Sequence, residues 1–299
     1  MEKIAIVSTL RAPLRQTLSF VRYHLHIGID ALFLFFDDPE DPALEILASC
    51  SQVTATACSP AYWRRLGHDA VPGIDERQDV NANVGMIMAI QHSCQWLLHI
   101  DCDELVRPCR EMHEVLGGSS ADILRLSLLE AVPQAEECEN VFSPVLFKKM
   151  ISARQKKMAL LLRCHGTFFE GSYFRGHTAS KTAVRLGPGI TRMGIHAPVT
   201  REGVVRKATD QLSLLHFGCI GFAEWMRKWE RRIDGSAVCN GIAKSRSKQF
   251  EYYLEARGAG ELALRKAYRR LYLLSRYQRF VLRLLGMTTT IRLDQRLFE

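Results

Sequence analysis

Short apolar runs alternate with amphipathic stretches over the first hundred residues. Three runs have the length and the β-branched or aromatic content of buried strands, and they lie at 3–8, 31–36 and 53–57. Between the first two, apolar residues recur every three or four positions over 14–27, and Gly28 follows as a helix-ending glycine would. Strand, helix and strand in this order predict a βαβ unit and a parallel sheet.

Further elements complete this half of the chain. A short helix is expected at 42–49 and a longer one at 76–94, and a strand follows at 96–100. The intervening stretch 59–75 mixes prolines and glycines with aromatic and basic residues, which predicts a long surface loop. The sequence therefore predicts an α/β fold with a Rossmann-like, mixed but mostly parallel sheet flanked by helices.

The pattern is less regular after Pro108. The expected elements are strands at 123–129, 179–186 and 212–217, helices at 222–233 and 261–285, and a short basic segment at 243–248. We expect one large domain at 1–235, with a nucleotide-binding half of about 1–108 and an acceptor half of about 109–235. A basic helical extension is expected at 236–299.

The predicted helix 261–285 separates its charges from its apolar residues. At 100° per residue, one arc of roughly 80° holds Arg265, Arg269, Arg276, Arg279 and Arg283. A basic amphipathic helix of this kind can bind an anionic membrane surface. The pattern equally fits a helix packed on the main domain with its arginines in water.

The strand at 96–100 ends in a cluster of acids. Its largely apolar residues run directly into Asp101, Asp103 and Glu104. Ligands bind at the carboxyl ends of strands in open α/β sheets, and on an extended chain Asp101 and Asp103 would point to the same side. Carboxylates held this close repel each other unless a cation or hydrogen-bond donors compensate them, and Mn²⁺ or Mg²⁺ bridged to phosphate oxygens would do so. The alternative is an acidic strand end that only faces water.

Charge and composition narrow the class of function. The chain has 299 residues, 47% of them hydrophobic, and 40 Lys and Arg against 32 Asp and Glu give a net charge of +8. This excess favours anionic partners such as nucleotide phosphates, acidic lipids or nucleic acid. The sequence contains neither Gly-x-Gly-x-x-Gly nor Gly-Lys-Ser/Thr, which argues against a dinucleotide site and a Walker-type nucleotidase.

Cysteine usage and hydropathy bear on location. The nine cysteines are scattered and form no Cys-x-x-Cys, which indicates free thiols in a reducing compartment. The N-terminal apolar run is too short for a signal peptide, and no run reaches the roughly 18 apolar residues of a membrane span. We therefore expect a cytoplasmic protein, with peripheral membrane contact through the C-terminal basic helix.

Two other functions fit parts of the sequence. A nucleotidyltransferase also holds a metal on a sheet-edge carboxylate pair. It usually has a glycine- and arginine-rich phosphate loop near the first strand, whereas residues 8–14 contain no glycine. A non-enzymatic protein that binds nucleic acid through Arg-rich helices would explain the charge but not the acids. No nucleic-acid partner is therefore expected.

Several short motifs occur together in the order expected of a known family. They are Tyr23-His24, Gly28-Ile29-Asp30, Asp37-Asp38, Arg77-Gln78 with Asn81, Trp96 to Glu104, Ser180-Lys181 with Val184-Arg185, Ile195-His196-Ala197-Pro198 and Leu215-His216-Phe217. Through these motifs the chain resembles the family-2-like glycosyltransferases with a GT-A fold, in particular the branch with an Asp-x-Asp-Glu motif. The resemblance implies an inverting transfer of a sugar from a nucleotide-sugar donor, with a UDP-sugar favoured. The acceptor would be a glycan or a lipid-linked glycan, such as a lipopolysaccharide or capsule precursor.

The resemblance also implies roles for individual residues. Donor-binding residues would be Thr9, Arg11, Asp37, Asp38, Gln78, Asn81, Asp101 and Lys181. Ligands of Mn²⁺ or Mg²⁺ would be Asp101, Asp103 and His216, and the residues near the acceptor would be His196 and Glu104. An inverting transfer needs a general base beside the acceptor hydroxyl. The candidates for it are Glu170, slightly ahead, with Glu130 and Asp210.

Overall fold

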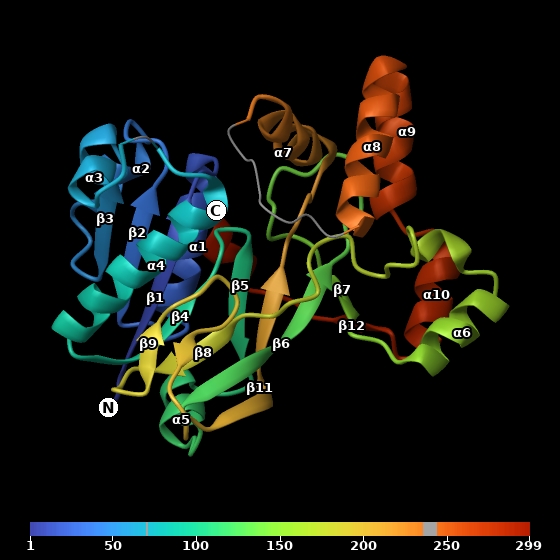
Figure 1. Cartoon of the computed structure of the whole chain (residues 1–299). Coiled ribbons are helices and arrows are strands. Elements are labelled where there is room, and N and C mark those ends of the chain that lie inside the picture. Colours follow the sequence, from blue (N-terminus) through green and yellow to red (C-terminus); the bar gives the residue numbers. More distant parts are fainter. Residues whose placement is uncertain (70, 236–243) are drawn as a thin grey trace. The chain divides into compact units, whose positions relative to one another are not determined.

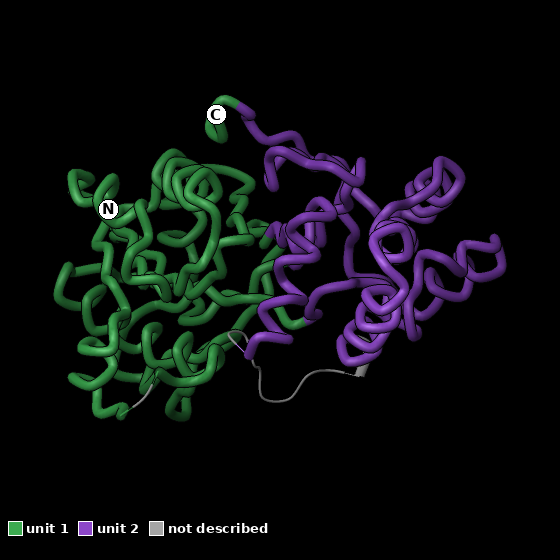
Figure 2. The backbone as a smooth tube through the Cα atoms, turned by 90° about the horizontal axis from the view of Figure 1, so that it is seen from above, with its two compact units in different colours: residues 1–127, 179–214, 296–299 green, residues 128–178, 215–295 purple. Residues whose placement is uncertain are grey.

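The computed structural model describes residues 1–69, 71–235 and 244–299. The chain folds into two compact units, coloured separately in Figure 2. Unit 1 consists of Met1–Ser127, Ala179–Leu214 and Arg296–Glu299, and unit 2 consists of Leu128–Thr178 and Leu215–Gln295. The chain crosses between the units four times: within strands β6 (Ile123–Ala131) and β11 (Arg206–His216), between residues 178 and 179, and between residues 295 and 296. The sequence-based divisions near 108 and 235 differ from these boundaries.

Unit 1 is built on a mixed sheet (Figure 1). Besides the first parts of β6 and β11, its strands are β1 (Lys3–Leu10), β2 (Ala31–Phe36), β3 (Val53–Ala57), β4 (Cys94–His99), β5 (Glu104–Pro108) and β8 (Thr182–Arg185), with a separate pair β9 (Ile190–Arg192) and β10 (Val199–Thr200). Strands β3, β2, β1 and β4 are adjacent in that order and parallel. Strand β8 is antiparallel to both β4 and β6, and β5 pairs with β11. A parallel N-terminal half continued by antiparallel strands confirms the predicted mixed sheet.

Helices flank this sheet, and they are α1 (Leu14–His26), α2 (Ala43–Leu47), α3 (Pro60–Arg65), α4 (Ile74–Gln91) and α5 (Met112–Gly117). Helix α4 lies directly against β1 because Gly85 has no side chain: a Cβ there would be 2.5 Å from Cγ2 of Val7. Helix α3 lies in the stretch predicted as one long loop. It begins where the hydroxyl of Ser59 accepts the amide of Tyr62, with a proline in its first turn.

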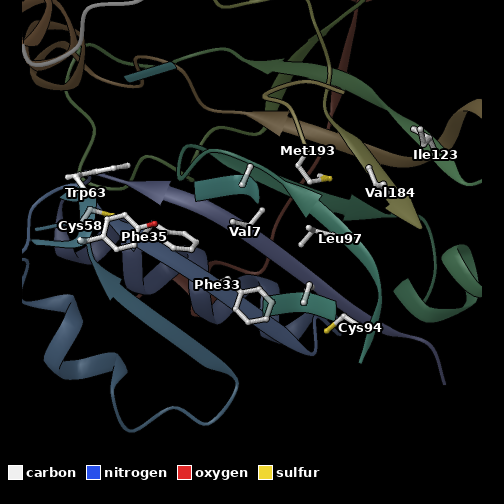
Figure 3. Close-up of a cluster of buried hydrophobic side chains, with 14 residues drawn as sticks. Val7, Phe33, Phe35, Cys58, Trp63, Cys94, Leu97, Ile123, Val184 and Met193 are labelled. Atoms are coloured by element: carbon white, nitrogen blue, oxygen red, sulfur yellow. The ribbon is translucent and has the colours of Figure 1, made fainter. Parts of the chain in front are cut away.

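A buried apolar cluster ties these elements together (Figure 3). The sheet contributes Val7, Phe33 and Leu97, while the segment after β3 contributes Cys58 and Trp63. Trp63 is only 1% exposed, so α3 is anchored in the core of unit 1. The prediction of a surface loop over 59–75 is therefore wrong for α3, because six residues are too few to show helical periodicity.

Unit 2 is mainly helical. Its helices are α6 (Ala153–Leu161), α7 (Phe222–Ile233), α8 (Lys244–Gly258), α9 (Glu261–Tyr272) and α10 (Arg276–Leu284), with a 3-10 turn η1 (His165–Thr167), and a second turn η2 (Gln295–Phe298) leads back to unit 1. Strands β7 (Leu146–Lys149) and β12 (Thr288–Thr290) extend the second part of β6 in antiparallel pairs. Helices α7, α8 and α9 pack around a cluster that includes Trp225, Tyr253 and Tyr268.

Two predictions for the C-terminal segment need correction. The basic segment at 243–248 is mostly the start of the longer helix α8, and residue 243 lies outside the described residues. The predicted helix 261–285 is two helices, because the backbone is extended at Leu273 and Ser275 starts α10 with a capping box to Gln278. Within 1–69, 71–235 and 244–299, none of the helices has the length and apolar character needed to cross a membrane.

Candidate functional site

The carboxyl ends of β1, β2, β3 and β4 meet at one edge of the unit 1 sheet, because these strands are parallel. Thr9 lies near the end of β1, Asp37 directly follows β2, and Asp101 follows β4. The first half of α4 hydrogen-bonds to all three of these residues. We call this region the carboxyl edge.

Arg77 of α4 forms a two-pronged ion pair with Asp37. Its Nε and Nη2 atoms lie 3.0 and 2.9 Å from the two carboxylate oxygens, and its Nη1 donates to the carbonyl of Pro72 at 2.7 Å. The two side chains are only 10% and 8% exposed. Asp37 is therefore fixed and its charge is balanced. The neighbouring predicted donor residue, Asp38, is exposed and accepts the amide of Glu40 at 3.0 Å.

Asn81 of α4 is fully buried and links two further elements to the helix. Its Nδ2 donates to Oγ1 of Thr9 at 3.1 Å, and its Oδ1 accepts the hydroxyl of Tyr62 at 2.6 Å. Two of the predicted donor-binding residues, Thr9 and Asn81, are thus in contact. Arg11, another of them, is exposed just beyond β1.

The predicted acids lie between β4 and β5. Residues 101–103 lead through a turn rather than along a strand, so strand alternation does not set their directions. Oδ1 of Asp101 accepts Nε2 of Gln78 at 2.9 Å, and Oδ2 lies 3.2 Å from Nζ of Lys181. Glu104 accepts the backbone amide of Asp101 at 2.9 Å and lies 3.9 Å from the same Nζ. Glu104 is 0% exposed, which places it behind Asp101 and not on an acceptor-facing surface.

Lys181 is a fully buried cation at this turn. Burial alone would lower the pKa of its amine, but Asp101, Glu104 and Asp103 outweigh burial and raise the pKa above its usual value. Three carboxylates, those of Asp101, Asp103 and Glu104, therefore act on this one ammonium group. Carboxylate oxygens are the ligands that Mg²⁺ and Mn²⁺ prefer. The side chains at this turn therefore fit such an ion.

His99, the last residue of β4, is buried beside this turn and neutral. Burial lowers its pKa to about 4, and Lys181 adds to the effect. Its Nδ1 lies 3.1 Å from the carbonyl oxygen of Gly194 and must carry the proton, because a carbonyl only accepts. His196, predicted near the acceptor, is half-buried and also lowers the pKa of His99. His99 is not among the predicted site residues, because in the sequence it reads as part of the apolar strand.

In unit 2, both oxygens of Glu130 are occupied. One accepts Nζ of Lys148 at 3.0 Å, and the other accepts the backbone amides of Arg175 and Gly176, each at 2.7 Å. Burial would raise the pKa of Glu130, but Lys148 and the Gly176 amide lower it below its usual value. Burial in turn lowers the pKa of Lys148 to about 8. This carboxylate is a poor proton acceptor, which weakens its candidacy as the general base.

His216 ends β11 in unit 2 and is 7% exposed. It packs against Gly176 and Gly218, at which any Cβ would collide with its ring. The ring of His177 lies beside it, with the centroids 4.8 Å apart. Sequence reasoning missed His177, because a single histidine after a glycine in an irregular segment shows no pattern.

The other two candidate bases are exposed. Glu170 of unit 2 has a positive φ of 49° in a turn closed by hydrogen bonds between Phe169 and Ser172. Asp210 of unit 1 precedes Gln211, whose carbonyl accepts the amide of Cys109 just past the end of β5. Asp210 therefore lies toward the end of β5 that is remote from Glu104 and the carboxyl edge.

Comparison with known proteins finds similarity to glycosyltransferases, although no family model matches the chain. It is 22% identical over 254 residues to the Arabidopsis thaliana protein glycosyltransferase-like At2g41451, covering 77% of this chain and 56% of that protein. It is also 22% identical over 258 residues to glycosyltransferase-like At3g57200 of the same plant, covering 77% and 49%. The chain spans about half the length of these curated relatives.

Solved structures similar to this chain include two transferases. One is GalNAc-T7 with UDP, GalNAc and Mn²⁺, at a TM-score of 0.39 and 11% identity, covering 87% of this chain and 57% of that one. Another is S. aureus TarS 1-349, at a TM-score of 0.34 and 9% identity, covering 86% and 74%. The resemblance to glycosyltransferases predicted from the motifs is confirmed by the two glycosyltransferase-like relatives.

Proposed function

We propose that this chain is a metal-dependent glycosyltransferase that moves a sugar from a nucleotide-sugar donor, a UDP-sugar by preference, to a glycan or lipid-linked glycan with inversion. The observation that carries the proposal is the acidic turn after β4, where Asp101 and Glu104 share the buried Lys181. The turn lies at the carboxyl edge, where open α/β sheets bind their ligands. The two glycosyltransferase-like relatives support the same reaction class.

In this proposal the carboxyl edge binds the donor. Thr9 would face the nucleoside, held in place by the buried Asn81, and Asp37 would hold Arg77 in place. The buried Lys181 and Gln78 would together fix the orientation of Asp101, the carboxylate nearest the diphosphate in this proposal. These contacts would orient the donor before transfer.

Asp101 and Asp103 would hold Mn²⁺ or Mg²⁺, and His216 is the third ligand that the resemblance implies. When bound, the metal would act as a Lewis acid that stabilises the charge on the departing nucleoside diphosphate. Glu170 is the proposed general base. Its support is that it is exposed and is held in a left-handed conformation, which side chains rarely adopt without a functional or structural constraint.

Release of nucleoside diphosphate from nucleotide sugars tests the proposal. The protein would be incubated with Mn²⁺ and separately with UDP-, GDP- and TDP-sugars, alone and with glycan acceptors. We expect release from one donor class, and its loss in Asp103→Ala but not in Glu114→Ala, which removes an exposed acid of α5. Release of pyrophosphate from a nucleoside triphosphate and a sugar phosphate would identify a nucleotidyltransferase instead. Retention of a labelled oligonucleotide without any release would favour the nucleic-acid-binding alternative.

A further inference from the structure

Helices α6 and α10 of unit 2 lie side by side (Figure 1). The hydroxyl of Tyr277 donates to the carbonyl of Leu162 at 2.9 Å, and Nε2 of Gln155 donates to the carbonyl of Leu285 at 3.0 Å. These bonds join each end of α10 to the α6 segment. The two helices therefore present a common outer surface.

This surface is apolar and exposed. In α10, Tyr277, Phe280 and Leu284 are spaced to lie on one helical face, and they are 53%, 66% and 69% exposed. The opposite face of α10 is buried through Val281 and Leu282. We name the outer surface the α6–α10 face, and define it by Met158, Leu161, Tyr277, Phe280 and Leu284. A concentration of large exposed apolar side chains marks an interaction site.

The charges around this face have one sign. Between Glu139 and Glu170 the sequence has no acid, and its cations, apart from Lys148 that is buried against Glu130, are Lys149, Arg154, Lys156, Lys157 and Arg163. Between Glu261 and Asp294 it again has no acid, and the cations are Arg265, Lys266, Arg269, Arg270, Arg276, Arg279, Arg283 and Arg292. Exposed apolar side chains thus lie among basic ones.

The arginines of α9 and those of α10 differ in their partners. Arg265 and Arg269 of α9 pair with Glu136, so an acid of the unit compensates these two arginines. Over the described part of the chain, no salt bridge involves Arg276, Arg279 or Arg283 of α10. Apart from Leu262, which is 81% exposed, the apolar residues of α9 pack in the α7–α9 core. The membrane surface expected along one helix 261–285 is therefore reduced to α10, with α6 beside it.

We propose that the α6–α10 face binds the surface of an anionic lipid bilayer. Phenylalanine, tyrosine and leucine would enter the interface between headgroups and acyl chains, while the arginines contact lipid phosphates. A second copy of this chain would present the same positive charge and be repelled. This inference stands independently of the glycosyl-transfer proposal, because it uses none of the carboxyl-edge residues.

Vesicle co-sedimentation tests the inference. The full chain would be mixed with vesicles of phosphatidylcholine alone or of phosphatidylcholine with phosphatidylglycerol. We expect sedimentation with the anionic vesicles only, and at least a tenfold loss of partitioning in Phe280→Ser/Leu284→Ser. The matched control is Ile87→Ser/Ile90→Ser, which removes two apolar residues of α4 that are 55% and 57% exposed. Arg276→Gln/Arg283→Gln should lose about 25-fold, since each basic residue at an anionic surface contributes about fivefold.

Three results would overturn the inference. They are absence of sedimentation, sedimentation that is equal for the control and the α6–α10 variants, and a wild-type dimer that becomes a monomer in Phe280→Ser/Leu284→Ser. Because these substitutions lie on exposed side chains, folding is checked by circular dichroism. Nucleotide binding should be the same in all these variants, so that failure of this inference is distinguishable from failure of the glycosyl-transfer proposal.

Discussion

The ammonium group of Lys181 lies 3.2 Å from the carboxylate of Asp101, and the lysine is 0% exposed. The lysine directly precedes β8, which pairs with β4 and so brings it to the turn after β4. The acidic turn thus contains a cation of its own.

Removal of this cation should destabilise unit 1. Lys181→Met leaves Asp101 and Glu104 without a buried counter-charge, and we expect the free energy of unfolding to fall by about 3 kcal/mol. The double variant Lys181→Met/Glu104→Gln should recover part of this loss, because one of the two carboxylates is then neutral. Urea denaturation measures both values, with Lys266→Met on the exposed side of α9 as the control. Equal losses in the single and double variants would contradict the pairing.

The stability of unit 1 should fall in mild acid through His24. Its Nδ1 donates to the carbonyl of Phe20 at 2.8 Å, and its Nε2 accepts the amide of Val106 at 3.2 Å, so the folded state needs the neutral ring. Burial lowers its pKa to about 3, below the ordinary value of 6.5. The unfolded chain therefore binds the proton first, and stability is lost as the pH falls below about 6.5, at up to about 1.4 kcal/mol per pH unit.

Urea midpoints at several pH values check this prediction. His24→Gln should flatten the dependence between about pH 6.5 and about pH 4, while the exposed His26→Gln should leave it unchanged. The buried His99 acts in the same direction, so a reduced slope is expected to remain in His24→Gln. An unaltered slope in that variant would contradict the account of His24.

Glu130 and Lys148 should behave as one structural unit. Each of Glu130→Gln and Lys148→Met leaves a buried charge unpaired, and each should cost about 3 kcal/mol of unfolding free energy. The double variant should cost clearly less than the sum, because neither charge then remains. Thermal and urea unfolding of the three variants give the coupling energy. Strict additivity would argue against the pair and would renew the case for Glu130 as a base.

The elements with the longest apolar runs were predicted most accurately. Strands β1, β2 and β4 contain long uninterrupted runs, and their predicted bounds lie within two residues of the observed ones. The break between α9 and α10 was not predicted, because Leu273 and Leu274 continue the apolar periodicity through the extended residue. The Ser275–Gln278 capping box was the available signal for it.

The candidate site was predictable where it depends on neighbours in sequence. The acids after β4 were identified because they directly follow an apolar strand, and Lys181 was expected among the donor-binding residues because of its motif. Its pairing with Asp101 depends on which strands are adjacent, and Glu130 meets Lys148 only through the register of β6 and β7. A single sequence fixes neither adjacency nor register.

Calorimetric titration with UDP tests whether the acidic turn after β4 is part of a metal-dependent donor site. The wild type, Asp101→Asn, Asp103→Ala and the control Glu114→Ala would each be titrated with Mn²⁺ present and with the metal chelated. We expect UDP to bind the wild type and the control only when Mn²⁺ is present. In both aspartate variants the affinity for UDP should be at least tenfold weaker. Binding of UDP that is unaffected by chelation and by both substitutions would contradict a metal-dependent donor site at this turn. Failure of the wild type to bind UDP, GDP or TDP would contradict it as well.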